Sequence, residues 1–168
     1  MADGQRSITA QEVRELFGYD EAAGQLFRLK ALPGNGRKAG SVVGCNHRNY
    51  LRCIIGGVRY AVHRLVWLHA YGEWPKWEID HINGDGRDNR LCNLRDVPHK
   101  INGQNQRNAR ADNKSNRLGA TWHKQSAKWR ARICIDGGQQ HIGSFDDAEA
   151  AHAAYVAAKR RLHVGCSI

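Results

Sequence analysis

Short runs of alternating apolar and polar residues dominate the first third of the chain. Residues 25–29 alternate after a polar turn at 20–24, and alternation of this kind predicts a β-strand with one buried face. The apolar runs 51–55 and 58–62 flank Gly56-Gly57, and two glycines between two such runs predict a β-hairpin. We therefore expect a β-rich N-terminal segment.

After this segment, the spacing of apolar residues changes from that of a strand to that of a helix. Residues 63–71 carry apolar side chains at helical spacing, and Gly72 and Pro75 mark the end of the predicted helix.

Two further short strands are predicted downstream, at 78–81 and 94–97, with a polar turn at 83–86 between them. Pro98 suits the first turn of a following helix. This region therefore has the order strand, loop, strand, helix.

The C-terminal third begins with a polar, basic stretch that lacks apolar periodicity and is interpreted as a linker. Residues 128–133 then alternate strictly, Asp136-Gly137-Gly138 predicts a hairpin turn, and 140–143 form the returning strand. Asp146 and Glu149 form a candidate N-cap and capping box for an alanine-rich helix that runs to about Leu162.

The uneven distribution of charge along the chain indicates what class of partner the protein binds. The formal net charge is +10, and residues 100–132 hold nine Lys and Arg side chains against one acid, a net of +8. A basic excess so localised indicates a polyanion partner, although a solvated basic surface is the alternative interpretation.

The cysteines and the N-terminus bear on the compartment. None of the five cysteines stands in a Cys-x-x-Cys spacing, which argues against a disulfide framework and a cysteine-rich zinc site. The N-terminus lacks an apolar signal region, and no apolar run reaches transmembrane length. We expect a cytosolic protein, or one delivered into the cytosol, with no membrane partner.

Candidate chemistry gathers around Asp80-His81, with Asn93 and Asn102 at 13 and 22 residues from Asp80. Hydrolysis of a phosphodiester needs an activated water, and neutral His81 can accept its proton near pH 7. The oxygen donors Asp80 and Asn102 suit Mg²⁺, or Mn²⁺, and a single metal is expected. Neighbours on a regular strand point to opposite faces, so the strand must end or twist here.

These residues resemble the HNH endonucleases of phages and homing elements. The resemblance rests on 62–67, 79–85, 88–90, 93–95 and Asn102. It implies the ββα-metal fold, with His81 as general base and Asp80 and Asn102 as metal ligands. It also implies that Asn93 ties the loop to the His81 strand and orients the imidazole, and that Arg64 contacts phosphate. Many relatives carry histidine where this chain has Asn102.

The C-terminal third resembles the APETALA/ethylene-response-factor DNA-binding domain, on residues 118–122, 128–133, 141–146 and 148–155. That resemblance implies a three-stranded antiparallel sheet, braced by one helix, that lies in the major groove. Alternation sends Trp129 towards the helix and Arg130 and Arg132 towards DNA. The predicted DNA contacts in this segment are Arg117, Trp122, Lys124, Lys128, Arg130, Arg132 and His141.

The predicted fold class is α+β: an HNH core with N-terminal β-hairpins, and a small three-stranded antiparallel sheet with one helix at the C-terminus. The predicted bounds are 1–62 for the β-rich segment, 63–108 for the nuclease core, 109–117 for a basic linker and 118–168 for the DNA-binding domain.

The predicted function is a metal-dependent endonuclease, homing-type or phage-encoded, that acts on double-stranded DNA as a monomer or homodimer. Its expected location is the bacterial or phage-infected host cytosol, and no small-molecule substrate is expected. A single site attacks one strand at a time, so a monomer is expected to nick. A catalytically inactive DNA-binding regulator that retains the HNH fold is the alternative. An RNA-binding protein is disfavoured because the sequence shows no aromatic stacking platform.

Overall fold

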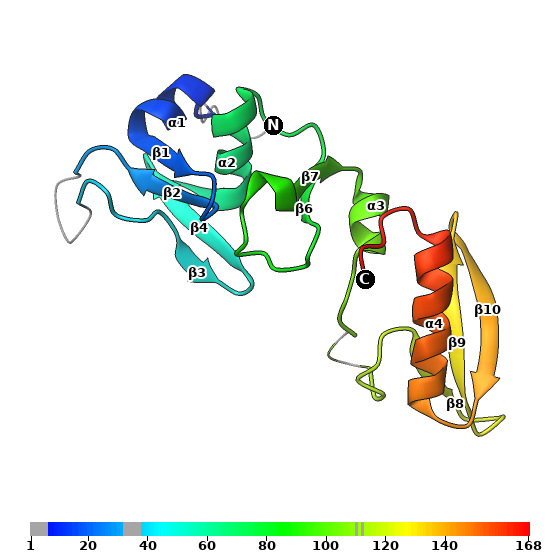
Figure 1. Ribbon diagram of the computed structural model, residues 1–168. Coiled ribbons are helices and arrows are strands. Elements are labelled where there is room, and N and C mark those ends of the chain that lie inside the picture. The colour runs from blue at the N-terminus through cyan, green and yellow to red at the C-terminus, as the bar shows by residue number, and fades with distance from the viewer. Residues whose placement is uncertain (1–6, 32–37, 110, 112) are drawn as a thin grey trace. The chain divides into compact units, whose positions relative to one another are not determined.

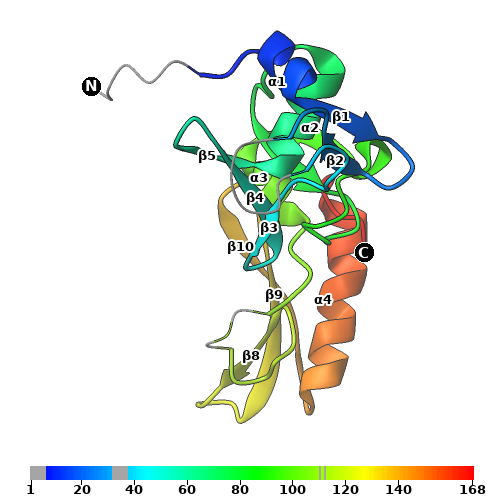
Figure 2. The same cartoon turned by 90° about the vertical axis from the view of Figure 1, so that its left-hand side faces the viewer.

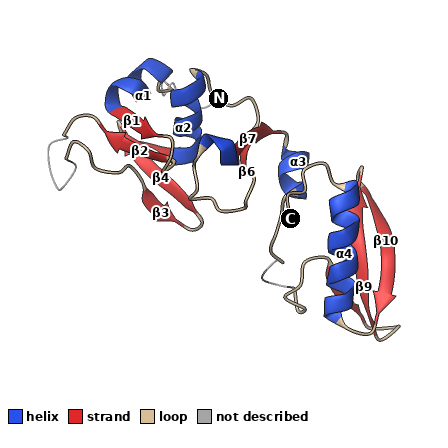
Figure 3. Cartoon of the chain, in the orientation of Figure 1, coloured by secondary structure: helices blue, strands red, loops and turns tan. Residues whose placement is uncertain are grey.

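The structure is a computed structural model that describes residues 7–31, 38–109, 111 and 113–168. It has two compact units, one ending at Pro98 and the other beginning at His99. In the described parts, short antiparallel sheets alternate with helices (Figure 1, Figure 3), so the predicted α+β class is confirmed.

The first unit opens with a helix that was not predicted from the sequence, α1 (Ala10–Leu16). Thr9 is its N-cap and forms a capping box with Glu12, in which each side chain accepts a hydrogen bond from the other residue's backbone N–H. This Thr-x-x-Glu pattern is the sequence signal for the helix start. Strands β1 (Phe17–Asp20) and β2 (Gln25–Arg28) follow as an antiparallel hairpin.

The predicted glycine hairpin lies in a three-stranded sheet of order β3-β4-β5. Its strands are β3 (Cys45–His47), β4 (Tyr50–Ile55) and β5 (Val58–Ala61). Gly56 and Gly57 both have positive φ, 55° and 82°, as the two central residues of a type I′ turn require. The predicted hairpin is therefore confirmed.

Helix α2 (Val62–Tyr71) also forms as predicted and ends at Gly72, whose φ of 81° is left-handed. Its buried side chains join α1, the β1–β2 hairpin and the neighbouring sheet in one apolar core. The buried members are Ile8, Val13, Phe17, Leu26, Val43, Cys53, Val62, Leu65, Val66, Leu68, Ile79 and Leu94.

The strands that carry the candidate chemistry are β6 (Glu78–His81) and β7 (Leu94–Val97), an antiparallel pair joined by a loop and the short 3₁₀ helix η1 (Leu91–Asn93). Ile79 and Leu94 anchor the pair in the core. On the polar side, Asp96 of β7 accepts hydrogen bonds of 2.7 Å from the backbone N–H groups of Lys76 and Trp77, which fixes the entry into β6.

The second unit begins with α3 (His99–Gln104), which is bound to the end of the chain. Gln104 accepts a 3.0 Å hydrogen bond from the backbone N–H of Gly165, and Arg107 donates one of 2.7 Å to the carbonyl of Ser167. Buried Lys159 donates to the carbonyl of Gln106. These long-range contacts hold α3 in the second unit, whereas the predicted domain bounds, with a linker at 109–117, stay a prediction.

The rest of the second unit is a sheet of order β10-β9-β8 covered by one helix (Figure 2). The elements are β8 (Ala120–His123), β9 (Lys128–Ile135), β10 (Gly138–Phe145) and α4 (Ala148–Leu162). Small residues, Ala120, Ala131 and Ala151, bring sheet and helix together. The predicted three strands and one helix are therefore present.

The start of α4 differs by one residue from the prediction. Asp147, not Asp146, is the N-cap and accepts a 2.7 Å hydrogen bond from the backbone N–H of Ala150. Asp146 instead forms an ion pair with Lys128 of β9. The side chain of Asp146 is thus directed to the sheet, which leaves the next aspartate to cap the helix.

All five cysteines are free thiols. Burial raises the pKa of Cys53 to about 11, so that thiol stays protonated at neutral pH. Among the described residues, no helix combines the length and apolarity needed to cross a bilayer.

The packing of the second unit leaves no room for a side chain at Gly119. Gly119 has a φ of +78°, and a Cβ there would lie 2.0 Å from Cγ of Tyr155 on α4. Gly137 has a similar φ of +82°, and apart from its chain neighbours no described residue has an atom within 4 Å of its Cβ position. We expect Gly137→Ala to cost about 1–2 kcal/mol from backbone strain alone. Gly119→Ala should cost about 1–3 kcal/mol more through the clash, and urea unfolding of the two variants measures the difference.

Candidate active site and nucleic-acid-binding face

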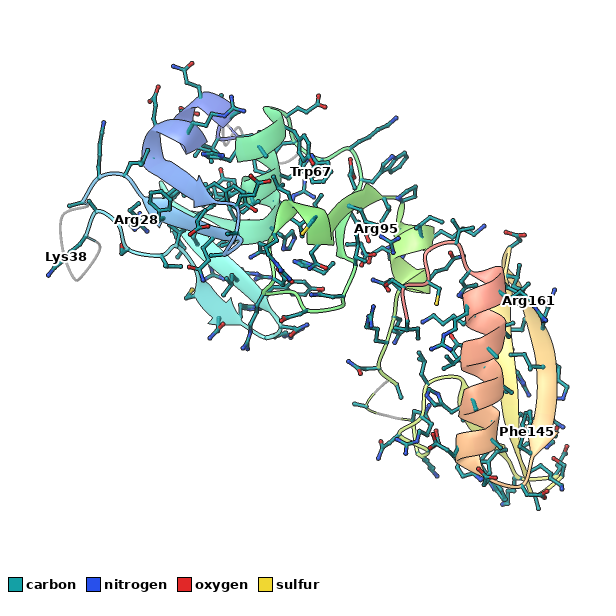
Figure 4. All side chains as sticks on the ribbon, viewed as in Figure 1. Arg28, Lys38, Trp67, Arg95, Phe145 and Arg161 are labelled. Atoms are coloured by element: carbon teal, nitrogen blue, oxygen red, sulfur yellow. The ribbon has the colours of Figure 1, made fainter. Side chains whose placement is uncertain are left out.

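Asp80 is buried on β6, 6% exposed, opposite Arg95 of β7. The guanidinium of Arg95, which is labelled in Figure 4, donates through Nε and Nη2 to the same carboxylate oxygen of Asp80, Oδ2, at 2.9 and 2.7 Å. Because Oδ2 takes both bonds, the orientation of the carboxylate is fixed by the neighbouring strand.

His81 is the last residue of β6 and is 4% exposed. The strand ends here as expected, although Asp80 and His81 are both still in register with β7, and the convergence of their side chains stays a prediction. Nε2 of His81 lies 3.0 Å from Oδ1 of Asn89. An amide oxygen only accepts, so Nε2 is the donor in this contact, and in a neutral ring the lone pair that a general base needs is then on Nδ1.

Two aromatic rings form the walls around the His81 imidazole. The ring of His63 from α2 stands edge-on to it, 5.1 Å between centroids, and the ring of Tyr50 from β4 lies at 5.8 Å. Burial, and then the nearby His81, Arg64 and Arg52, lower the pKa of His63 to about 3. His63 is therefore neutral at neutral pH, and its Nδ1 is buried without a hydrogen-bond partner among the described residues.

Asn93 braces the loop that follows β6. Its Oδ1 accepts from the backbone N–H of Asn83 at 2.9 Å, and its Nδ2 donates to Oδ1 of Asn83 at 3.0 Å and to the carbonyl of Asp88 at 2.7 Å. The loop also packs against the β3–β4 turn at Gly86, where a Cβ would lie 2.3 Å from the carbonyl oxygen of Asn49.

A side chain hydrogen-bonded to the imidazole is therefore that of Asn89, to which the HNH resemblance gave no role, while the expected orientation of the ring by Asn93 stays a prediction. Asn89 is 1% exposed and was overlooked in the sequence, although it stands in the Asp88-Asn89-Arg90 triplet of the resemblance. The signal that the sequence offered was the place of Asn89 in this triplet, and its burial then requires a hydrogen-bond partner.

Asn102, the other expected metal ligand, is half-buried on α3. It belongs to the second unit, whereas Asp80 and His81 belong to the first. Its pairing with Asp80 around one metal stays a prediction.

The donor chemistry of the candidate ligands fits a hard divalent cation. The described residues contain no group of three or more His, Cys, Asp or Glu side chains placed to hold a metal. Carboxylate and carboxamide oxygens, the donors of Asp80 and Asn102, are the ones that Mg²⁺ accepts.

The C-terminal sheet presents one polar face on the side away from α4. Arg130 of β9 stands opposite Thr121 and Ser144, and Arg132 stands opposite His141. Arg132 and His141 are both exposed, and Arg132 donates to Gln139 at 3.4 Å. The alternation that separates these side chains from buried Ala131 and Ile133 is confirmed.

The remaining predicted DNA contacts have varied surroundings. Lys128 pairs with Asp146, Arg117 donates to Glu149 at 2.6 Å, and Lys124 is exposed in the turn after β8. Arg64 of α2 stacks over Trp74, 5.5 Å from the ring centroid.

Trp122 is placed differently from the prediction. It stands opposite Trp129 in the β8–β9 ladder, and the two rings meet edge-on at 5.2 Å. Paired residues in a ladder share a face, so Trp122 lies on the α4 side of the sheet, 46% exposed, and not beside Arg130.

Comparison with known proteins locates the HNH similarity. Residues 60–104 match a family model described as HNH endonuclease. Over 102 residues the chain is 34% identical to Protein 3.8 of Escherichia phage T7, a match that covers 60% of this chain and 83% of that protein. No solved structure matches the chain significantly.

Proposed function

The chain belongs to the same family as Protein 3.8 of Escherichia phage T7 and carries an HNH endonuclease domain, and on this premise we propose that it is a metal-dependent DNA endonuclease. One observation carries the proposal. Within the region that matches the HNH model, a carboxylate and a tautomer-fixed imidazole are adjacent on β6 and are both held by side chains.

The proposed roles follow from these contacts. His81 takes the proton of the attacking water at Nδ1, because Asn89 holds the proton on Nε2. Asp80 offers a carboxylate oxygen to the cation, and Asn102 is proposed as the second ligand. Asn93 acts at a distance: it holds the loop after His81 in place.

A divalent cation, most simply Mg²⁺, would neutralise charge on the phosphate and on the departing 3′-oxygen when bound. Asp80 is the only acid at a proposed ligand position, which favours one cation over two. One such site cuts one strand at a time, so nicking is the proposed outcome for a monomer, and double-strand cleavage would need a homodimer or two events.

The reaction is tested on supercoiled plasmid with the full-length protein. We expect open circles to accumulate with Mg²⁺, and with Mn²⁺ in its place, and to be absent when EDTA removes the cation. DNA ligase should reseal the nicks, since hydrolysis with a 3′-oxygen leaving group produces a 3′-hydroxyl and a 5′-phosphate. Plasmid binding without any metal-dependent nicking would instead favour the inactive DNA-binding regulator.

We further propose that the polar face of the C-terminal sheet anchors the enzyme on duplex DNA. Support comes from Arg130, Arg132 and His141, which gather on one face without α4 above it, and from the basic excess of this region. Of the other predicted contacts, Lys124 stays in this proposal, whereas Lys128 and Arg117 would have to leave Asp146 and Glu149 to reach a phosphate. Arg64 would similarly have to leave Trp74.

Replacing both Arg130 and Arg132 by alanine should weaken duplex binding at low salt. The slope of log affinity against log salt should fall by about 0.9 for each phosphate that the variant no longer neutralises. The matched control is Arg160→Ala with Arg161→Ala, which removes the same charge from exposed positions on α4. An equal loss of affinity in both double variants would show that total charge, and not the sheet face, determines binding.

A further inference from the structure

We propose that the N-terminal β1–β2 hairpin is a positioning element for the general base. Tyr19 and Gly24 of this hairpin fix the backbone of Asn89, and Asn89 in turn fixes the imidazole of His81. The inference rests on the proposed role of His81 in DNA hydrolysis. It assigns a function to a segment that supplies no reacting group.

Tyr19 of β1 holds the chain on both sides of Arg90. Its hydroxyl donates to the carbonyl of Asn89 at 3.0 Å and accepts from the backbone N–H of Leu91 at 3.2 Å. Burial raises the pKa of this phenol, which keeps the donating proton in place at neutral pH. One side chain thus satisfies a backbone acceptor and a backbone donor that flank a single residue.

Gly24, in the turn between β1 and β2, makes a second contact with the same stretch. A Cβ at this position would lie 2.5 Å from the backbone N of Arg90 and 2.8 Å from the carbonyl carbon of Asn89. Its φ of +67° also belongs to the left-handed region. The hairpin tip therefore packs directly on the backbone of residues 89–90, at a distance that only glycine permits.

The side chain of Asn89 is buried and makes a single hydrogen bond among the described residues. Its Oδ1 bonds Nε2 of His81, while its Nδ2 is buried and has no hydrogen-bond partner among the described residues. With a single side-chain hydrogen bond, the direction of the amide is set by the position of its backbone. A shift of residues 89–90 would consequently turn Oδ1 away from the imidazole.

The test uses the full-length protein and two readouts, of which one is independent of activity. ¹⁵N NMR of the histidine rings, with the His81 signal identified from a His81→Gln sample, reports which nitrogen carries the proton. We expect Nε2–H in the wild type and a mixture of tautomers in Tyr19→Phe and in Asn89→Ala. Tyr71→Phe, an exposed tyrosine on α2, should keep the wild-type signal.

The kinetic readout asks whether Tyr19 acts through Asn89. We expect Tyr19→Phe to lower the turnover rate about 10-fold with DNA affinity unchanged, since small misplacements of reacting groups are costly. The double variant Tyr19→Phe/Asn89→Ala should be no slower than Asn89→Ala alone.

Two results would overturn the inference: fully additive losses in the double variant, or a Tyr19→Phe protein whose His81 tautomer matches the wild type. Gly24→Ala supplies a second variant that should show the same tautomer mixture. If the wild type proved unable to cleave DNA, the proposed function would fail, but the NMR comparison would still decide whether the hairpin sets the His81 ring.

Discussion

Replacing His81 by alanine should slow Mg²⁺-dependent nicking of supercoiled plasmid by about 10²–10⁴-fold, the usual contribution of a general base. The variant loses the imidazole, and with it the proposed proton acceptor, but it leaves Asp80 and the proposed DNA-binding face in place. DNA affinity, measured by fluorescence anisotropy, should therefore stay within about two-fold of the wild type.

The control for this variant is His47→Ala, which removes an exposed imidazole from β3 of the same unit. It should cleave at the wild-type rate. Cleavage by His81→Ala at the wild-type rate would refute the assignment of the base, whatever the control shows.

Replacing Asp80 by asparagine should slow metal-dependent cleavage by a factor similar to that for His81→Ala, because a neutral amide replaces the charged donor of the proposed ligand pair. The Mg²⁺ concentration for half-maximal nicking should rise, if any activity is measurable. The substitution also leaves Arg95 without its carboxylate. Breaking a buried pair costs about 3–5 kcal/mol, and we expect less here because the Arg95 side chain is about a quarter exposed.

Arg95→Gln separates these two effects, since it breaks the same ion pair while keeping the carboxylate of Asp80. It should lower the unfolding free energy but retain cleavage that depends on Mg²⁺. If Arg95→Gln lost activity as completely as Asp80→Asn, loss of the ion pair rather than of a metal donor would explain both variants.

Much of the local structure was predictable because it is encoded over a few residues. The type I′ turns at Gly56-Gly57 and Asp136-Gly137 follow from the residues that tolerate positive φ, and both are present. The strict alternation of β9 likewise separates Arg130 from Ala131. Helix α1 was equally accessible through its Thr9–Glu12 capping box, and it was overlooked.

The features that were missed depend on contacts between distant residues. The Tyr19 hydroxyl meets the backbone of Leu91 across 72 positions, and Arg107 meets Ser167 across 60. The spacing of apolar residues along the sequence carries no information about such contacts. For this reason, neither the support of Asn89 nor the attachment of α3 to the chain end was predicted. The placement of Trp122 was missed for a related reason, since the face of an edge strand follows from its register with β9.

The sequence predicted the reacting groups of the candidate site but not the residues that hold them in place. Asp80 and His81 were identified by residue type and spacing, and the match to the HNH model covers them. Their immediate partners are Arg95 and Asn89, which the spacing argument did not include. The orientation of the carboxylate and of the imidazole follows from those partners and not from the motif.

The measurement that tests the central claim most directly is sequencing of the DNA ends that the full-length protein produces on plasmid and genomic DNA. We predict breaks with 3′-hydroxyl and 5′-phosphate ends that require Mg²⁺, and a return to background with His81→Ala. Breaks that form equally with EDTA, or equally with His81→Ala, would contradict the proposed endonuclease mechanism.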